Sequence, residues 1–242
     1  MLEVIISGCA LVGLGAAAYW GPHAARLRQE RQLRFSCIAS RSLVLTYDDG
    51  PGPTLTPRLL DLLAAQGAPA TFFVLGRKAA DHPQLVDRIR AEGHEIGCHS
   101  SQHLHPWKAW PWQVLADIRG GFESLAPWVA PNGLFRPPHG KLSAVNWLAL
   151  RRRGASLAWW TIDSGDTSSV LPQPQSVADA VARAGGAVVL MHDFDRKVQE
   201  RSDFVLRVTE ALLRMARSES MSVRRYGDLC AAPRAAGVTC SA

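Results

Sequence analysis

From residue 42 onward, the chain alternates between short apolar stretches and longer helical patterns, and this alternation limits the folds it can adopt. Short apolar runs bounded by Gly, Pro or polar turns are typical of buried strands. Seven strand–helix steps predict an α/β fold: a distorted (β/α)7-type barrel of parallel strands with right-handed crossovers. An open doubly wound sheet is the alternative. The predicted strands are 43–47, 70–75, 94–98, 133–136, 156–162, 186–191 and 221–224.

The helical stretches carry start and stop signals of the usual kind. The pattern over 83–92 has Pro at its first turn, apolar residues on one face and Gly93 directly after it. Such a Pro begins a helix without losing a hydrogen bond, and such a Gly ends one. The predicted helices are 57–66, 83–92, 112–126, 143–153, 176–184 and 203–217.

Composition excludes several classes of function. The 242 residues are 47% hydrophobic, which is enough for the core of one large domain. Lys and Arg number 27 against 21 Asp and Glu, but they are mostly scattered, so nucleic-acid binding is not indicated. No Gly-rich dinucleotide motif follows the first strand, and there is no Walker motif. A phosphatase or nuclease would need a phosphate-binding loop or a second metal cluster, and neither is visible.

The N-terminal segment is nearly uncharged over 4–20, and it predicts a membrane anchor, with a buried terminal helix as the alternative. Basic residues follow the apolar segment and none precedes it. The positive-inside rule therefore predicts a catalytic domain on the cytoplasmic side, with an extracytoplasmic placement as the alternative. The predicted organisation is an anchor over 1–22, a basic linker over 23–40, a catalytic domain over 41–228 and a tail over 229–242.

The first predicted strand ends in two adjacent carboxylates, Asp48 and Asp49. Close carboxylates repel, so that either one pKa rises or a cation holds both. In parallel α/β folds, active sites form at the carboxyl ends of the strands. Titratable or cationic residues follow four further predicted strands, and together they predict a site at one edge of the sheet. They are His99 and His103, Arg136 and His139, Asp163 and Asp166, and His192.

The two histidines after the third strand, His99 and His103, are four residues apart. On one turn of a helix both imidazoles would face the same way and could hold one metal ion. The spacing alone is more often that of two surface histidines. With Asp49 as a third ligand it becomes a His₂–carboxylate set with open positions, which is typical of catalytic metal centres. Asp48 would then remain as a base for the metal-bound water.

Five short motifs in this order and spacing resemble those of the polysaccharide deacetylases, the NodB-homology group or carbohydrate esterase family 4. The resemblance covers about residues 41–227. It implies a distorted (β/α) barrel, a divalent metal that is most often Zn²⁺, and hydrolytic removal of an N-acetyl group from an amino sugar. The motifs are Thr46-Tyr47-Asp48-Asp49-Gly50-Pro51, His99-Ser100-xx-His103, Arg136-xx-His139-Gly140, Asp163-xx-Asp166 and Leu190-Met191-His192.

Carried over by position, the resemblance implies a role for each motif residue. Asp49, His99 and His103 would bind the metal. Asp48 would be the general base, and Arg136 would keep it ionised and oriented.

The remaining motifs imply the acid and the substrate pocket. His192 would protonate the leaving amine, and either Asp163 or Asp166 would tune it. The backbone N–H of His139 would stabilise the tetrahedral oxyanion. Two apolar side chains would shape the pocket for the acyl methyl group, namely Leu190 and Trp160.

Two departures from the family pattern bear on the substrate. His139 stands where the family usually has Tyr, and Thr167 where it usually has Trp, so an apolar wall is missing. With the anchor, this favours an N-acyl amino sugar on a polyprenyl-phosphate lipid. A polymer outside the cytoplasm, either peptidoglycan or an exopolysaccharide, is the alternative. A non-catalytic carbohydrate-binding relative is a third possibility, and the complete set of metal ligands, base and acid argues against it.

Overall fold

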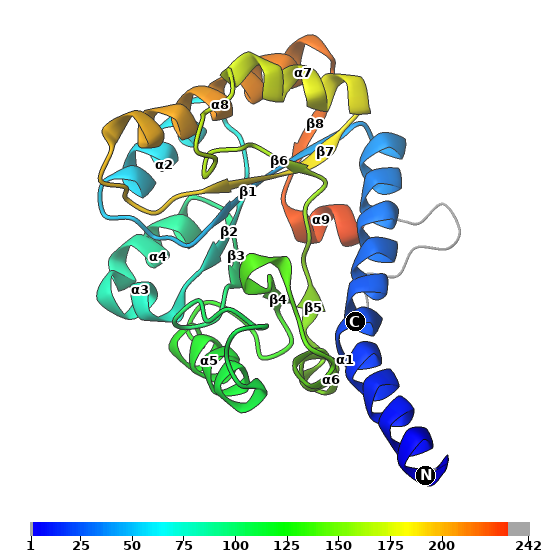
Figure 1. The fold of residues 1–242 in the computed structure, drawn as a ribbon. Coiled ribbons are helices and arrows are strands. Elements are labelled where there is room, and N and C mark those ends of the chain that lie inside the picture. The colour runs from blue at the N-terminus through cyan, green and yellow to red at the C-terminus, as the bar shows by residue number, and fades with distance from the viewer. Residues whose placement is uncertain (1, 232–242) are drawn as a thin grey trace.

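A computed structural model describes residues 2–231 of the chain, and its side chains over 21–231. The strands form one sheet in the order β5-β4-β3-β2-β1-β7-β6, with β8 paired to β1, and the sheet curls into a half-barrel (Figure 1). All strand pairs are parallel. The strands are β1 (Ser42–Asp48), β2 (Thr71–Val74), β3 (Glu95–Cys98), β4 (Leu134–Phe135), β5 (Ser156–Leu157), β6 (Ile162–Asp163), β7 (Ala187–His192) and β8 (Ser222–Arg224).

The central strand of the sheet is β1, and all seven of its residues are buried. β7 pairs with it over 43–48, so β2 and β8 must share its other edge. β2 pairs with its C-terminal half over 46–48, and β8 pairs with its start over 42–44. The register places Asp48 opposite His192 on β7, so a predicted base and a predicted acid end neighbouring strands.

Helices cover the sheet where they bury an apolar face. In α8, Phe204, Val208 and Leu212 recur every four residues and are buried, as expected for one helical face. α6 and α7 end at Gly154 and Gly185, whose φ angles of 76° and 75° are left-handed and favour glycine. The remaining elements are α1 (Leu2–Ala39), α2 (Leu55–Ala65), α3 (Gly76–Asp81), α4 (Pro83–Ala91), α5 (Pro111–Ser124), the 3₁₀ turn Pro138–Gly140, α6 (Ala144–Arg153), α7 (Pro174–Ala184), α8 (Gln199–Ser218) and α9 (Tyr226–Ala231).

The strand predicted over 156–162 is two short strands at opposite ends of the sheet. The N–H of Ala158 donates to the carbonyl oxygen of Phe135 on β4 at 2.9 Å, whereas that of Thr161 donates to the carbonyl oxygen of Val188 on β7 at 2.9 Å. The chain therefore changes partners between these two residues and crosses the open side of the half-barrel. The sequence shows only that the segment 156–162 is mostly apolar. An apolar pattern predicts that a residue is buried, but it does not specify which strand that residue pairs with. The sheet is parallel, as predicted, but the predicted distorted (β/α)7-type barrel is a curled half-barrel.

The segment predicted as a basic linker, 23–40, is helical and forms the second half of α1. Two of its side chains, Leu33 and Cys37, are buried in the core. α1 lies beside β1, β7 and α6, along one side of the domain (Figure 1). The partly buried positions of α1 also include Arg26 and Gln29. Because both residues are polar, the sequence does not show the apolar repeat that is typical of a buried helix face.

Within the part of the chain that the structure describes, no helix combines the length and apolar character needed to cross a membrane. The anchor predicted over 1–22 falls mainly on 1–20, whose side chains lie outside the described ones, so it stays a prediction. Most of the predicted tail, from 232 onward, also lies outside the described residues.

If the second half of α1 belongs to the domain, its buried leucine should contribute to stability. We expect Leu33→Ala to lower the free energy of unfolding by about 2–4 kcal/mol, because it leaves a cavity in the core. Leu27→Ala is the control: this side chain is 52% exposed in the same helix, and we expect a change within about 0.5 kcal/mol. Urea unfolding measures both, and equal effects would contradict the packing of α1.

Candidate active site

The carboxyl end of β1 places two acids in reach of one imidazole. Asp48 is buried, and Asp49 has a φ of 69°, which interrupts the extended backbone directly after the strand. Asp48 Oδ2 lies 3.8 Å from His99 Nε2, and Asp49 Oδ1 lies 3.4 Å from the same nitrogen. Neighbouring side chains of a regular strand point to opposite faces, so this turn is what brings both carboxylates to one site.

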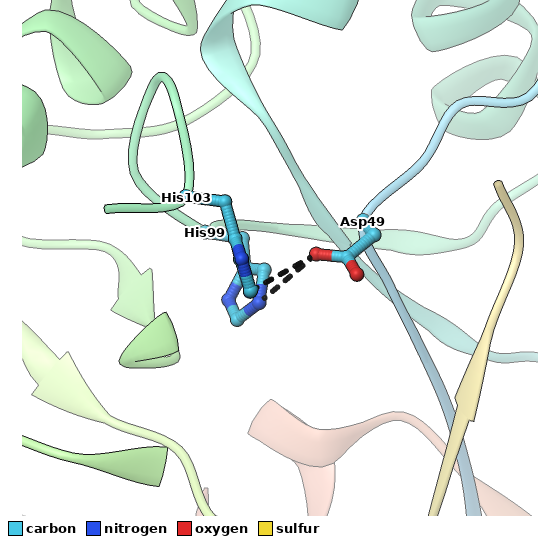
Figure 2. A group of neighbouring side chains, drawn as sticks. All are labelled: Asp49, His99 and His103. Atoms are coloured by element: carbon cyan, nitrogen blue, oxygen red, sulfur yellow. Dashed lines mark ion pairs between the residues drawn. The ribbon is translucent and has the colours of Figure 1, made fainter. Parts of the chain in front are cut away.

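Asp49, His99 and His103 form a group whose ligand atoms all lie within 4.8 Å of one another (Figure 2). The Oδ1 atom of Asp49 lies 3.3 Å from His103 Nε2 and receives no hydrogen bond, although it is buried. His99 Nδ1 lies 2.7 Å from the carbonyl oxygen of Arg136, which can only accept. His99 must therefore carry its proton on Nδ1, and its Nε2 lone pair faces Asp49. These donors fit a metal ion.

The electrostatics of the triad favour the protonation states that a metal requires. Burial alone would raise the pKa of Asp49, but the facing His99 and His103 lower it. Burial lowers the pKa of His103, more than the charge of Asp49 raises it. An ionised carboxylate and a neutral imidazole are the forms that bind metal ions.

The two histidines lie on a loop, not on the helical turn that their spacing predicts. Ser100 and His103 have positive φ angles of 66° and 61°, whereas the residues of a right-handed helix have negative φ angles. The loop is held by Asp117 of α5, which is buried and accepts the N–H groups of Ser101, Gln102 and Leu104. Asp117 is a supporting residue that the sequence analysis missed. Its only signal is a charge at an inward position of α5.

Arg136, at the end of β4, is fully buried and reaches the predicted base. Its Nη1 donates to Asp48 Oδ1 at 2.7 Å and to Thr46 Oγ1 at 2.8 Å. Its guanidinium carbon lies 4.0 Å from the centre of the Phe73 ring. The contact with Asp48 that the family resemblance implies is therefore present.

His192 ends β7, and its partner is Asp166. The His192 Nδ1 lies 2.9 Å from Asp166 Oδ1, and Arg196 Nη2 donates to Asp166 Oδ2 at 2.9 Å. Burial alone would lower the pKa of His192, but Asp166, with the charges of Asp48 and Asp49, raises it to about 9. Of the two predicted candidates, Asp163 is exposed and accepts the Gly165 N–H instead.

The triad, Asp48 and His192 line one cleft of about 430 Å³. The predicted substrate-binding residues His139, Leu190 and Trp160 all line it. His139 has a φ of 56°, and its N–H finds no acceptor among the residues that the structure describes. Burial and the neighbouring His103 and His105 lower the pKa of the His139 imidazole to about 4. A neutral ring and a free N–H suit the binding of a polar, uncharged group.

The cleft thus combines a triad fit for a metal, a carboxylate held by an arginine and a protonated imidazole. Such a set can activate water on one side of a substrate and protonate a leaving group on the other. These groups are suited to the hydrolysis of an amide or ester bond.

Comparison with known proteins gives the family. The chain belongs to the polysaccharide deacetylase family, whose model matches residues 36–158. It is 34% identical to a peptidoglycan-N-acetylglucosamine deacetylase of Bacillus cereus over 62% of this chain and 72% of that protein. It is also 37% identical to a chitooligosaccharide deacetylase of Rhizobium leguminosarum bv. trifolii, over 63% of this chain and 72% of that protein. The chain is therefore, by class, a carbohydrate N-deacetylase.

Solved structures agree on the fold. A family 4 carbohydrate esterase from Streptomyces lividans, in complex with acetate, superposes with a TM-score of 0.65 at 28% identity, covering 75% of this chain and 91% of that chain. A peptidoglycan N-acetylglucosamine deacetylase superposes with a TM-score of 0.70 at 25% identity, covering 79% of this chain and 89% of that chain.

The Asp166 contact predicts a specific dependence of the rate on pH. Because the pKa of His192 is raised to about 9, its acid form is present at neutral pH and is lost above that value. We expect kcat/KM to fall as pH rises through about 9. Asp166→Asn removes the charge that raises this pKa, so the alkaline limb should move down by roughly one to three pH units.

The matched control is Asp163→Asn, which lies three residues before Asp166 in the same motif. We expect it to leave the alkaline limb in place, because the Asp163 carboxylate is exposed and accepts the N–H of Gly165 within its own turn. An alkaline limb that moves with Asp163→Asn and stays with Asp166→Asn would reverse the assignment.

Proposed function

We propose that this protein hydrolyses the N-acetyl group of N-acetylglucosamine residues in a glycan, with a divalent metal, most often zinc, held by Asp49, His99 and His103. The observation that carries the proposal is the placement of Asp48 and His192. They end neighbouring strands and line the same cleft as the triad. A base and an acid are what amide hydrolysis requires, because water must lose a proton and the amine must gain one.

In the proposed reaction, Asp48 accepts a proton from the attacking water, whose oxygen bonds to the acetyl carbon. The negative charge that develops on the carbonyl oxygen is stabilised by the His139 N–H. As the carbon–nitrogen bond breaks, His192 donates its proton to the nitrogen, so acetate and a free amine leave. Leu190 and Trp160 would contact the acetyl methyl group.

Arg136 would orient Asp48 through the 2.7 Å contact and oppose its charge. A divalent metal, when bound, would supply Lewis-acid polarisation of water and of the carbonyl group. Its binding would also relieve the unpaired, buried Oδ1 of Asp49.

For the substrate, we favour a chitooligosaccharide or peptidoglycan glycan, because relatives of more than 30% identity are named for these. Thr167 lines the cleft where the family usually has Trp, and this leaves space beside the site for a larger sugar or a flanking group. The polyprenyl-linked substrate depends on the predicted anchor, and we keep it as the second candidate.

Acetate release tests the proposal. Zinc-loaded protein is given an N-acetylglucosamine oligomer, peptidoglycan and a polyprenyl-phosphate N-acetylhexosamine, and free acetate is measured. We expect release from the first two, loss of release with a chelator, and recovery with zinc. Asp48→Asn should retain zinc and lose about a hundredfold to ten-thousandfold in kcat. Release from the lipid-linked sugar alone would favour the second candidate, and zinc binding without release from any would favour a non-catalytic relative.

For localisation, the glycan substrates favour a catalytic domain outside the cytoplasm, whereas the basic flank of the predicted anchor favours the cytoplasmic side. We propose the extracytoplasmic side, following the substrate. A fusion of alkaline phosphatase, which is active only after export, to the C-terminus should then be active. An active cytoplasmic reporter at the same position, with an inactive phosphatase, would contradict this.

A further inference from the structure

An arginine of α1, Arg26, reaches the loop that carries His139. Its Nη1 donates to the carbonyl oxygen of Gly140, the residue directly after His139. Its guanidinium carbon lies 5.1 Å from the ring centre of Trp159 and 4.9 Å from that of Trp160. Glu30, one turn further along the helix, accepts from Arg26 Nε at 2.7 Å. The side chains of Arg26 and Glu30 are only 20% and 16% exposed, so this is a partly buried ion pair.

Two of the residues that Arg26 contacts belong to the cleft. Gly140 and Trp160 line it, and they flank the predicted oxyanion donor and the predicted acetyl pocket. Gly140 has a φ of 60°, and a Cβ added there would lie 2.6 Å from both Arg26 Nη1 and the Trp160 ring. The loop, the indole and the guanidinium are therefore packed against one another without room for a larger residue.

The far side of the loop is not filled by protein. A second, smaller cavity of about 80 Å³ lies between α1 and the same loop, and its lining includes Arg26, Gly140, Lys141 and Trp159. The loop thus stands between the cleft on one side and this cavity on the other. Two consecutive residues with positive φ, His139 and Gly140, give it a backbone that neighbouring contacts must hold in place.

We propose that Arg26 is a positioning residue for catalysis: it holds the His139 N–H and the Trp160 wall against the acetyl group. The inference rests on the proposed function. None of the five motifs includes α1, so this role goes beyond the residues that the family pattern supplies. Small displacements matter here, because a donor stabilises a developing charge only within hydrogen-bond distance of it.

A second arginine of α1 supplies a matched control. Arg34 Nη2 also donates to a backbone carbonyl of the barrel, that of Thr161, at 3.1 Å. Thr161 does not line the cleft, and Arg34 is an exposed residue. If these arginines merely dock the helix, Arg26→Gln and Arg34→Gln should behave alike.

The experiment compares acetate release by the full-length wild type, Arg26→Gln and Arg34→Gln on an N-acetylglucosamine oligomer and its N-propionyl analogue. For Arg26→Gln we expect kcat to fall by about tenfold to a hundredfold, with KM changed less than about threefold. The preference for acetyl over propionyl should fall by about fivefold or more, because the methyl pocket loosens. Arg34→Gln should stay within about twofold of the wild type, and zinc content should be equal in all three.

The outcomes separate the two proposals. An active wild type with equal kinetics and acyl preference in both variants would overturn the role of Arg26 alone. A wild type that releases no acetate would overturn the proposed function, and the role of Arg26 with it.

If Arg26→Gln does not fold, Glu30→Gln takes its place, since it removes the group that orients Arg26 Nε. We expect a smaller change in the same direction, and wild-type acyl preference in Glu30→Gln would overturn the inference.

Discussion

The site depends first on the buried guanidinium of Arg136. A fully buried charge is costly unless it is paired, and here Asp48 at 2.7 Å and Thr46 at 2.8 Å satisfy one nitrogen, Nη1. The same residue also acts through its backbone, because its carbonyl oxygen accepts the Nδ1 proton of His99. One residue directly after β4 therefore orients the proposed base on β1 and selects the tautomer of a proposed metal ligand after β3. Removing Arg136 would leave Asp48 buried without its counter-charge.

A second ionic network supports the acid. Asp166 is fully buried and binds His192 on one side and Arg196 on the other. Asp166 and Arg196 come from segments that lie apart in the chain, and β7 brings them together. The two networks meet only in the cleft, so the base and the acid are held by separate arginines. The proposed base and the proposed acid therefore each have their own charged partner, as two separate proton-transfer steps require.

Backbone strain is concentrated at the same place. In the described part of the chain, six non-glycine residues have positive φ, and Asp49, Ser100, His103 and His139 are four of them. Each such residue costs on the order of 1–3 kcal/mol, and the surrounding contacts must offset that cost. Asp117 holds the histidine loop through three N–H groups, and α1 contacts the His139 loop through Arg26. The outer helices therefore contribute to the geometry of the site as well as to the core.

The sequence by itself determined the order of the strands along the chain, the edge at which the chemistry gathers and the identity of its residues. Asp48, Asp49, His99, His103 and His192 were predicted because apolar runs and their polar ends are local patterns, and the tertiary structure brings these five together in one cleft. Only the tertiary structure decided between Asp163 and Asp166, since the two are three residues apart and equally acidic. It also divided 156–162 between two strands, placed the histidines on a loop and made 23–40 part of the domain. In each case the deciding contact joins residues far apart in the chain, such as Asp166 with Arg196 or Arg26 with Gly140, and no local pattern records it.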